Sequence, residues 1–407
     1  MKNLKRIYGS IISGHLKTNR QMVFVTGPRQ VGKTFACRSL LQDKSKYVNW
    51  DNLDDRALIL KGPSALASKL QLDRLSASKT VIVLDELHKF SKWKSFLKGF
   101  FDTYEEQASI LVTGSLMMNI HRKSGDSLMG RYFLYRMHPF SIAELANTDI
   151  PSHKSIVRPP SRISEKDFNA LYEHGGFPEP FINRTKSFTS RWWGLRLEQL
   201  IKEDMRDMTR LHELAQLEVM ARILQSRSGT QLNYSTLASE VRVSIDTVRR
   251  WTDALCSMQF GFMLRPWHKN ISNSLLKEPK WYLRDWTGIN DPGARIETFV
   301  ACHLLKAVEG WTDLGFGDFS LFYLRDKMKR EVDFLIVRDG IPWFLAEVKK
   351  SDDKISKSLH YFMEKTEAPH AFQIVFDADY VDADCFASKG KGKPLIVPAK
   401  TLLSQLI

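Results

Sequence analysis

Apolar and polar residues alternate in blocks over the first third of the chain. Helical patterns separate four short apolar runs that read as β-strands, namely MVFVTG, KYVNWD, TVIVLDE and SILVTGS. Strands that alternate with helices are typical of a parallel sheet flanked by helices. Residues 1–20 have the pattern of an amphipathic helix that leads into the first strand. We therefore predict an α/β domain over residues 1–150.

The rest of the chain shows three further patterns. Proline and polar residues in TDIPSHKSIVRPPSRIS break the alternation. The residues that follow have a helical pattern, which GGFPEP interrupts. We therefore predict a linker and helical lid over 151–225. Residues 226–290 predict two helices joined by a turn and then short strands, and 291–407 predict a second α/β segment. At 407 residues, about two to four domains are expected.

Composition narrows the class of partner and the compartment. The net charge of +14 and the pI of about 9.5 favour a polyanion, nucleic acid before membrane. The four cysteines are scattered without a CxxC pair, which favours a reducing compartment over a zinc site or disulfide framework. No apolar run approaches the ~18 residues that span a bilayer, and the N-terminus lacks a signal-peptide core. We expect a cytoplasmic protein without membrane association.

A phosphate-binding motif follows the first apolar strand. The sequence GPRQVGKT fits G-x-x-x-x-G-K-T and precedes a helical pattern. Its glycines let backbone N–H groups wrap phosphates at a helix N-terminus. We expect Lys33 to reach the β- and γ-phosphates and Thr34 to hold Mg²⁺, with ATP as the nucleotide. The predicted nucleotide-binding residues are Gly27, Pro28, Arg29, Gln30, Val31, Gly32, Lys33, Thr34 and Phe35.

The next two strands end in further candidate residues. VIVLDE places Asp85 near the Mg²⁺ at the carboxyl edge of the sheet and lets Glu86 act as a general base on water. Two acids in a solvated turn are the structural alternative. SILVTGS ends with Thr113 and Ser115, either of which could sense the γ-phosphate, although a simple strand-end turn fits equally well.

The order of these motifs resembles a known family. GPRQVGKT, LDELHK, ILVTGS, SLMGRYFLYRMHPFSIAEL and GGFPEP together resemble a prokaryotic family of AAA-type ATPases in which a C-terminal domain of uncharacterised function follows the ATPase. The resemblance covers nearly the whole chain and implies an AAA-like P-loop core. It makes Arg131 the candidate arginine finger, a residue that often acts on a neighbouring subunit and would then require a homo-oligomer. A structural arginine paired with a carboxylate is the alternative.

The middle of the chain has helix–turn–helix spacing. In YSTLASEVRVSIDTVRRWTDALCSM, Ser244 is a plausible N-cap, and the second helix presents Arg249 and Arg250 together with two acids on its exposed face. The strands that follow fit a wing carrying Lys269 and Lys280. A winged helix of this kind would contact DNA phosphates or guanines. Contacts to another protein are the alternative.

The sequence EVDFLIVRDGIPWFLAEVKK predicts a β-hairpin. One register gives a continuous apolar face and a three-residue connection from Asp339 to Ile341, pairing Val332, Phe334 and Ile336 with Val348, Ala346 and Phe344. The same register sets Asp333 opposite Glu347 and Lys349 opposite Glu331, with Cβ atoms ~5 Å apart.

An Asp followed by Glu-x-Lys on the next strand resembles the PD-(D/E)xK arrangement of restriction-endonuclease-like nucleases. The resemblance implies that Asp333 and Glu347 ligate Mg²⁺ and that Lys349 stabilises or deprotonates the attacking water. Glu297, on the apolar side of an upstream helix, resembles the extra helix glutamate of many such nucleases, or it is a rim glutamate that reaches water. Val332 replaces the motif's proline. A Glu–Lys salt bridge on a solvated sheet edge is the structural alternative.

Together these patterns predict a P-loop NTPase (AAA-like) parallel sheet with a helical lid, a winged-helix domain and a C-terminal restriction-endonuclease-like α/β domain. The predicted function is ATP hydrolysis coupled to binding and processing or remodelling of nucleic acid, DNA before RNA, with a Mg²⁺-dependent nuclease-like site. Two alternatives are a nucleotide-dependent signalling switch and an ATPase whose C-terminal domain binds DNA without cutting it.

Overall fold

The computed structural model describes residues 4–114, 128–153, 155–204, 213–267, 278–351, 354–387 and 392–407. They separate into two compact units. The N-terminal unit runs to His138 and includes Thr148–Ile150, and the C-terminal unit comprises Pro139–Asn147 and Pro151–Ile407.

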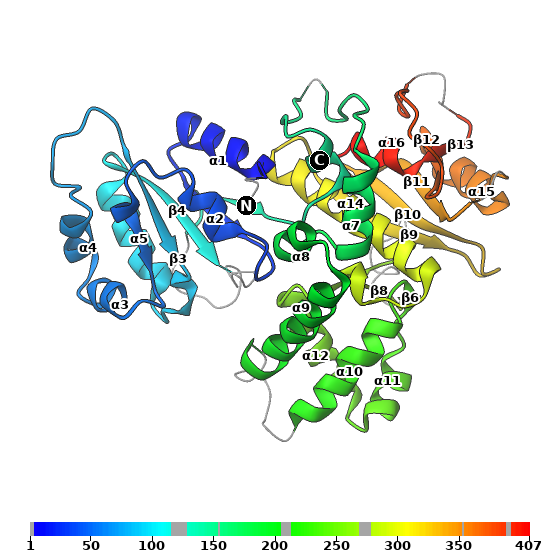
Figure 1. Ribbon diagram of the computed structural model, residues 1–407, viewed down its shortest axis with the longest axis horizontal. Helices are drawn as coiled ribbons and strands as arrows, with labels where there is room; N and C mark the ends of the chain where they lie inside the picture. Colours follow the sequence, from blue (N-terminus) through cyan, green and yellow to red (C-terminus); the bar gives the residue numbers. More distant parts are fainter. Residues whose placement is uncertain are drawn as a thin grey trace. The chain divides into compact units, whose positions relative to one another are not determined.

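The N-terminal unit is built on a parallel sheet of five strands in the order β2-β3-β4-β1-β5 (Figure 1). The strands are β1 (Met22–Thr26), β2 (Tyr47–Asn49), β3 (Thr80–Asp85), β4 (Ala108–Gly114) and β5 (Tyr132–Arg136). The first four are the predicted runs, so the predicted α/β fold with a parallel sheet is confirmed. β5, which pairs with the outer edge of β1, was not predicted from the sequence.

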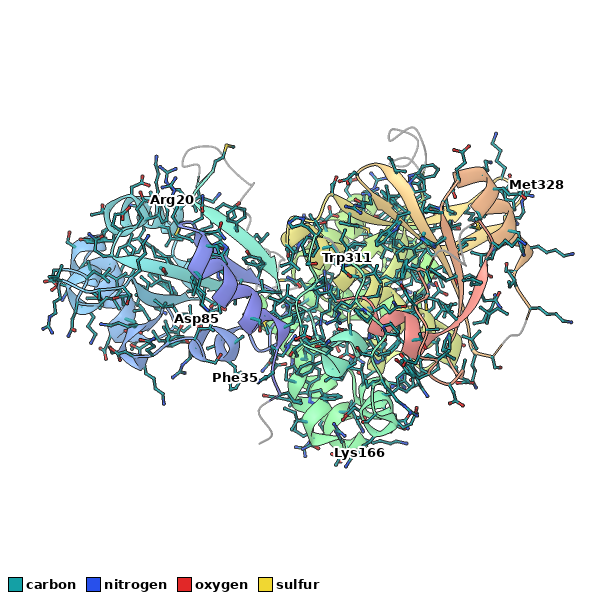
Figure 2. The ribbon with its side chains drawn as sticks, turned by 90° about the horizontal axis from the view of Figure 1, so that it is seen from above. Arg20, Phe35, Asp85, Lys166, Trp311 and Met328 are labelled. Carbon is teal, nitrogen blue, oxygen red and sulfur yellow. The ribbon has the colours of Figure 1, made fainter. Side chains whose placement is uncertain are left out.

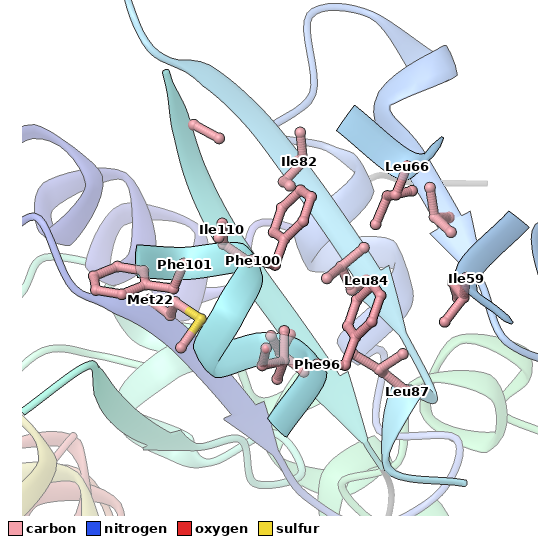
Figure 3. Close-up of a cluster of buried hydrophobic side chains, with 14 of the residues drawn as sticks. Met22, Ile59, Leu66, Ile82, Leu84, Leu87, Phe96, Phe100, Phe101 and Ile110 are labelled. Carbon is pink, nitrogen blue, oxygen red and sulfur yellow. The ribbon is translucent and has the colours of Figure 1, made fainter. Parts of the chain in front are cut away.

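Helices cover both faces of this sheet. They are α1 (Ile7–Thr18), α2 (Lys33–Arg38), α3 (Leu53–Leu60), α4 (Pro63–Lys69) and α5 (Trp93–Tyr104). One face holds a buried cluster in which Phe96 and Phe100 of α5 pack with Ile82, Leu84 and Ile110 of the central strands (Figure 3). Burial of each such side chain contributes roughly 1.5–3 kcal/mol. This core fixes the strands, and therefore the edge at which all five carboxyl ends meet.

The C-terminal unit begins with helices, as predicted for this part of the chain. They are α6 (Ile142–Ala146), α7 (Glu165–His174), α8 (Pro178–Asn183) and α9 (Lys186–Gln199), which continues into a π-helical turn at Leu200–Asp204. Ser164 caps α7 by accepting a hydrogen bond from the Asp167 N–H at 3.1 Å. Gly175, at φ 81°, ends α7, and Pro178 occupies the first turn of α8. The interruption at GGFPEP is therefore a pair of helix boundaries.

The next part combines three helices with a small antiparallel sheet. In chain order the elements are α10 (Leu214–Ser226), β6 (Thr230–Gln231), α11 (Tyr234–Val241), α12 (Ile245–Ser257), β7 (Gly261–Leu264) and β8 (Lys280–Leu283), with the strand order β6-β8-β7. Ser244 is the N-cap of α12, as predicted, because its hydroxyl accepts from the Thr247 N–H at 3.1 Å.

A mixed sheet forms the last part, in the order β13-β12-β11-β10-β9. Its elements are α14 (Pro292–Asp313), β9 (Phe319–Arg325), β10 (Glu331–Arg338), β11 (Ile341–Lys349), α15 (Lys357–Thr366), β12 (His370–Val375), β13 (Leu395–Pro398) and α16 (Ala399–Ser404). The first three strands are antiparallel, and β12 and β13 run parallel to β11. Trp311 of α14 is fully buried inside this unit, whereas Met328 lies at its periphery (Figure 2).

The predicted hairpin is β10–β11, and its central register is confirmed. Phe334 pairs with Ala346, and Ile336 pairs with Phe344. The register then shifts after Ile336, so the predicted three-residue connection is wrong. The turn consists of Asp339 and Gly340, at φ 51° and 79°, because both residues accept the left-handed conformation that a two-residue hairpin turn requires.

The predicted single apolar face is also wrong. Val332 packs in one cluster with Leu335 and Leu345 beside α15, because two residues of β10 oppose one residue of β9 between Val332 and Leu335. Such a β-bulge changes the face to which the following side chains point. Phe334 is therefore buried on a different side from Val332, against Tyr282 at 5.9 Å between ring centroids.

The segment Pro139–Asn147 folds with the C-terminal unit, although the sequence suggested a boundary near residue 150. Glu144 and Lys306 form a fully buried ion pair at 2.5 Å. The Ile142 N–H donates to His303 Nε2 at 3.0 Å, so His303 is neutral, and burial lowers its pKa to about 3. These contacts fix α6 onto α14.

We predict that Glu144→Ala destabilises the C-terminal unit by about 3–5 kcal/mol, because it removes the carboxylate that balances the charge of the buried Lys306 ammonium. Urea unfolding followed by tryptophan fluorescence measures the change. The control is Glu218→Ala, which breaks the exposed 2.8 Å pair with Arg222 and should change stability by less than about 0.5 kcal/mol. Equal effects of the two substitutions would contradict the prediction.

Candidate nucleotide site and carboxylate cluster

The loop between β1 and α2 is the predicted phosphate-binding motif. Gly27 and Gly32 have φ values of 154° and 97°, which favour glycine. A Cβ on Gly27 would collide with the Met137 carbonyl. Arg6 donates to the Val31 carbonyl at 2.8 Å and so ties the loop to α1, a role that the sequence analysis missed because the two residues are distant in the chain.

Lys33 is the first residue of α2, and its side chain turns back into this loop. Its ammonium donates to the carbonyl oxygens of Gly27 at 2.8 Å and Pro28 at 2.9 Å. Burial lowers the pKa of Lys33 to about 8, and the nearby carboxylates of Glu86 and Asp85 oppose that shift. Among the described residues, the ammonium donates to carbonyl oxygens, which a phosphate can replace.

Asp85 is held by hydroxyl groups from three other elements. Its Oδ2 accepts from Thr34 Oγ1 at 2.8 Å and from the Tyr47 hydroxyl at 2.6 Å, and its Oδ1 accepts from Thr113 Oγ1. The structure therefore brings Thr34 and Asp85 together, and their oxygens suit Mg²⁺. Thr113 is buried against Asp85 and positions it. Ser115 lies outside the described residues.

Tyr47 is a functional candidate that the sequence analysis missed. It begins β2, and β2 pairs with β3 so that Tyr47 lies beside Val83. Burial and the hydrogen bond to Asp85 raise the pKa of the Tyr47 phenol, so its hydroxyl remains a donor. Only the strand order shows this proximity, because no motif connects the two residues.

Glu86 follows Asp85 in a left-handed conformation at φ 55°, which is uncommon outside glycine. Its N–H donates to the Thr113 carbonyl at 3.0 Å, and its carboxylate lies 3.2 Å from the Lys89 ammonium. Lys89 in turn pairs with Asp51 at 2.6 Å. The Glu86 carboxylate is thus fixed at the carboxyl edge, close enough to Lys33 to raise the pKa of that ammonium.

The remaining predicted loop residues surround the same edge. Phe35 is 58% exposed on α2, so its ring is available for stacking, and Figure 2 labels it with Asp85 in the N-terminal unit. Val31 is buried, whereas Arg29 and Gln30 are exposed. Arg136, not singled out from the sequence, ends β5 beside Thr26 at this edge.

Arg131 lies at the amino ends of the strands, whereas the phosphate-binding loop lies at their carboxyl ends. It precedes β5, whose first residue pairs with Met22, and the loop starts only after Thr26, about 13 Å further along the strand. Its guanidinium makes a bidentate contact with Asp102 at 2.7 and 2.9 Å. At this distance Arg131 does not face the phosphate-binding loop of its own chain. Its contact with Asp102 matches the alternative interpretation, an arginine paired with a carboxylate.

A second group of charges lies in the C-terminal unit around Lys280. Its ammonium is 2.6 Å from Glu331 Oε1, 3.3 Å from Glu297 Oε1 and 3.8 Å from Asp333 Oδ1. The side chain of Lys280 is only 5% exposed. The prediction that Lys280 contacts DNA from an exposed wing is therefore wrong, because its side chain points inward from β8. Lys269 lies outside the described residues.

Asp333 lies at the β-bulge of β10. Its Oδ2 accepts a hydrogen bond from the Val348 N–H of β11 at 2.9 Å. Burial and the Glu297 carboxylate raise the pKa of Asp333 to about 7, and Lys280 opposes this shift.

Glu347 and Lys349 leave β11 on the same side. The Lys349 ammonium is 2.9 Å from Glu347 Oε1, and Glu347 Oε2 is buried without a hydrogen-bond partner among the described residues. Glu331, expected opposite Lys349, pairs with Lys280 and, at 2.8 Å, with Arg325. An unpartnered buried carboxylate oxygen is costly unless a cation or donor reaches it.

Two of the three predicted metal ligands fit a divalent ion. Asp333 and Glu347 offer hard oxygen atoms. Glu347 Oε2 accepts no hydrogen bond from the described residues, so a cation could bind it without displacing a donor. Glu297 does not fit, since its Oε1 already accepts from the Tyr282 hydroxyl at 2.6 Å and faces Lys280. Over the described residues, no three Asp, Glu, His or Cys side chains form a group that could hold a metal.

The two predicted DNA-contacting arginines lie on the exposed face of α12, as expected. Arg249 stacks over the Tyr234 ring at 5.5 Å, and Arg250 is 3.4 Å from Glu213. Both guanidinium groups reach solvent, so this face can present positive charge.

Comparison with protein families agrees with the N-terminal site. Residues 19–146 match a family described as the AAA domain, which confirms the predicted AAA-type P-loop domain. Residues 165–290 and 292–383 match two families that are each described as a domain of unknown function, DUF8612 and DUF4143. A search of curated proteins found no match. Nowhere in the described part of the chain is a helix long and apolar enough to cross a membrane.

Three solved structures show a distant likeness. AMPPCP-bound DnaA from Aquifex aeolicus is 13% identical, with 63% of this chain and 88% of that chain covered at a TM-score of 0.32. The Bacillus subtilis DNA clamp loader delta protein is 9% identical (60% and 87%, TM-score 0.29), and a DNA polymerase III gamma subunit-related protein from Thermotoga maritima is 9% identical (61% and 98%, TM-score 0.27). These scores are too low to support an inference about function.

We predict that nucleotide affinity falls as the pH rises above about 8, approaching about tenfold per unit. The free Lys33 ammonium has a pKa of about 8, and bound phosphate would raise that pKa, so binding takes up a proton. Titration calorimetry with ATP across the alkaline range measures the effect. Lys33→Met should bind weakly at every pH, and an equally steep decline in that variant would assign it to another group.

We also predict that Tyr47→Phe weakens Mg²⁺-dependent nucleotide binding about tenfold, because Asp85 loses one of the hydroxyls that orient it. The Mg²⁺ concentration for half-maximal binding of a fluorescent ATP analogue measures this. The control is Tyr132→Phe on β5, whose ring stacks on Phe24 at 4.5 Å, away from Asp85. Equal Mg²⁺ dependence in both variants would contradict a positioning role.

Proposed function

We propose that this chain hydrolyses ATP and acts on DNA. The observation that carries the proposal is the arrangement of Lys33, Thr34 and Asp85 at the carboxyl edge of a parallel sheet. A buried ammonium in the loop and a carboxylate bonded to a threonine hydroxyl are the groups that a nucleotide triphosphate and its metal require. The AAA-domain match over residues 19–146 supports the same assignment.

In this proposal each residue has a distinct role. Lys33 leaves the loop carbonyls for the β- and γ-phosphates, and Thr34 and Asp85 hold Mg²⁺, which would neutralise charge on the phosphates. Glu86 accepts a proton from the attacking water or polarises it. Phe35 is placed to stack on the nucleotide base. An arginine finger acting in trans stays part of the proposal, and Arg131 would have to leave Asp102 to serve as one.

DNA is the proposed partner because of the fold and charge of residues 214–283 in the C-terminal unit. The order α10-β6-α11-α12-β7-β8, with strand order β6-β8-β7, supports a winged helix, and in this proposal α12 is its recognition helix. Arg249 and Arg250 point to solvent from that helix. The net charge of +14 favours a polyanion. A helix of this kind fits the DNA major groove better than the narrow groove of duplex RNA.

The last part supports a nuclease-like assignment. The order α14-β9-β10-β11-α15-β12, with an antiparallel hairpin followed by a parallel strand, supports a restriction-endonuclease-like core. In this proposal Asp333 on β10 and Glu347 and Lys349 on β11 are its motif residues. In this proposal the two carboxylates hold Mg²⁺, and Lys349 acts on the water that attacks the phosphodiester.

A second candidate function is DNA binding without cleavage. One observation favours it, namely the Lys280 ammonium among the carboxylates, where a nuclease would place its metal. The same ATP site and DNA-binding helix serve both candidates. They differ only in whether the Asp333–Glu347 site cuts.

The ATPase and DNA parts are tested together. ATP turnover should rise on addition of DNA and vanish in Lys33→Ala. Arg249→Ala with Arg250→Ala should reduce the slope of log affinity against log salt by about 2, since two phosphate contacts are lost. The matched control is Arg222→Ala with Arg227→Ala, which removes equal charge from other exposed positions of the same unit. Slow turnover that DNA does not stimulate would instead support a nucleotide-dependent signalling switch.

Cleavage is tested on labelled duplex, forked and four-way-junction DNA with Mg²⁺, with and without ATP. Cutting by the wild type that is lost in Asp333→Ala would establish the nuclease-like site as active, and its ATP dependence would show coupling to Lys33. DNA binding without cutting by any variant would select the second candidate.

A further inference from the structure

The backbone of Lys280 lies in the small sheet of the C-terminal unit, and its side chain reaches the large sheet. Its backbone pairs with Gln231 and Leu264 in the small sheet. Its side chain reaches Glu297 on α14 and two carboxylates on β10. The ammonium also lies 5.7 Å from the Tyr323 ring of β9. A lysine predicted for a DNA-contacting wing thus connects the small sheet to the nuclease-like site.

The three carboxylates share this one ammonium. Glu331 and Glu297 lie within hydrogen-bond distance of the ammonium, at 2.6 and 3.3 Å, and Asp333 lies at ion-pair distance, 3.8 Å. The Tyr282 hydroxyl, from the same strand as Lys280, fixes Glu297 at 2.6 Å. Burial beside these acids is tolerated because each lies next to a cation or donor.

Charge is close to balanced without a metal ion. Four carboxylates, those of Glu297, Glu331, Asp333 and Glu347, face three cations, those of Lys280, Arg325 and Lys349. A divalent ion added to this group would meet the Lys280 ammonium at short range, and like charges repel strongly in a partly dry site. Without Lys280, the acids would exceed the cations by two charges, which one divalent ion balances.

One oxygen is nevertheless available to a metal. Glu347 Oε2 is buried and has no hydrogen-bond partner among the described residues, and its side chain is 9% exposed. Glu347 lies close enough to Asp333 to act on the ionisation of that carboxyl group. The pair therefore offers metal-binding oxygen atoms beside a position that an ammonium fills.

We propose that Lys280 is a built-in counterion that closes the Asp333–Glu347 site to divalent ions, and that the site binds one such ion when Lys280 is removed. This inference rests on the proposed function, in which these carboxylates form a nuclease-like metal site. Because the Lys280 backbone belongs to the small sheet, the occupancy of the site is tied to the position of that sheet. Lys280 is a regulatory residue in this scheme and does not touch the substrate.

The test uses Mn²⁺ as a spectroscopic substitute for Mg²⁺, with the full chain and without nucleotide. Titration followed by electron paramagnetic resonance counts bound ions. Wild type and Lys280→Arg, which keeps the charge, should show no saturable site. Lys280→Met should bind one ion per chain, and Lys280→Met with Asp333→Asn should lose it. Mn²⁺ should also raise the thermal unfolding midpoint of Lys280→Met but not that of the wild type.

Two results would overturn the proposal in different ways. A saturable Mn²⁺ site in the wild type that Asp333→Asn removes would show that Lys280 does not exclude the metal, while the proposed nuclease-like site would stand. A folded Lys280→Met that binds no ion would remove both the counterion role and the metal site. Circular dichroism verifies folding. If Lys280→Met does not fold, Lys280→Met with Glu331→Gln replaces it, since that variant removes one surplus acid and keeps Asp333 and Glu347.

Discussion

A charged side chain that leaves water must find opposite charge or several hydrogen bonds inside the protein, and both candidate sites are arranged by this requirement. In the N-terminal unit, loop carbonyls surround Lys33, and hydroxyls of three elements surround Asp85. In the C-terminal unit, carboxylates surround Lys280. The first arrangement can give up its internal partners to a nucleotide. In the second, the partners of the ammonium are charged groups of the chain itself.

Local sequence was sufficient for the first site. The motif from Gly27 to Thr34 encodes a loop, a helix start and its chemistry within eight consecutive positions, and an apolar strand that ends in Asp85 must reach the same edge of a parallel sheet. Tyr47 could not be found this way, because its contact with Asp85 depends on which strand neighbours β3. The position of Arg131 was not predictable for a related reason, since the unrecognised β5 places it at the end of the strands opposite the phosphate-binding loop.

The second site was predicted only in part. Hydrophobic alternation gave the central register of the hairpin and the nearness of Asp333 to Glu347, because one-residue slips expose apolar side chains. It could not show the bulge at Asp333, which is set by pairing with β9. Nor could it place Lys280. A lysine that follows a polar loop is usually solvated, and its partners here come from two elements later in the chain.

The family match and the compact N-terminal unit end at different residues, and α6 lies between the two ends. The AAA-domain match extends to residue 146, yet Pro139–Asn147 is buried against α14 and the C-terminus. A fragment cut at the end of the match would carry an apolar helix and the Glu144 carboxylate without their partners. A fragment that ends at His138 would not. A fragment meant to hold the nucleotide site alone should therefore end at His138 and not at residue 146.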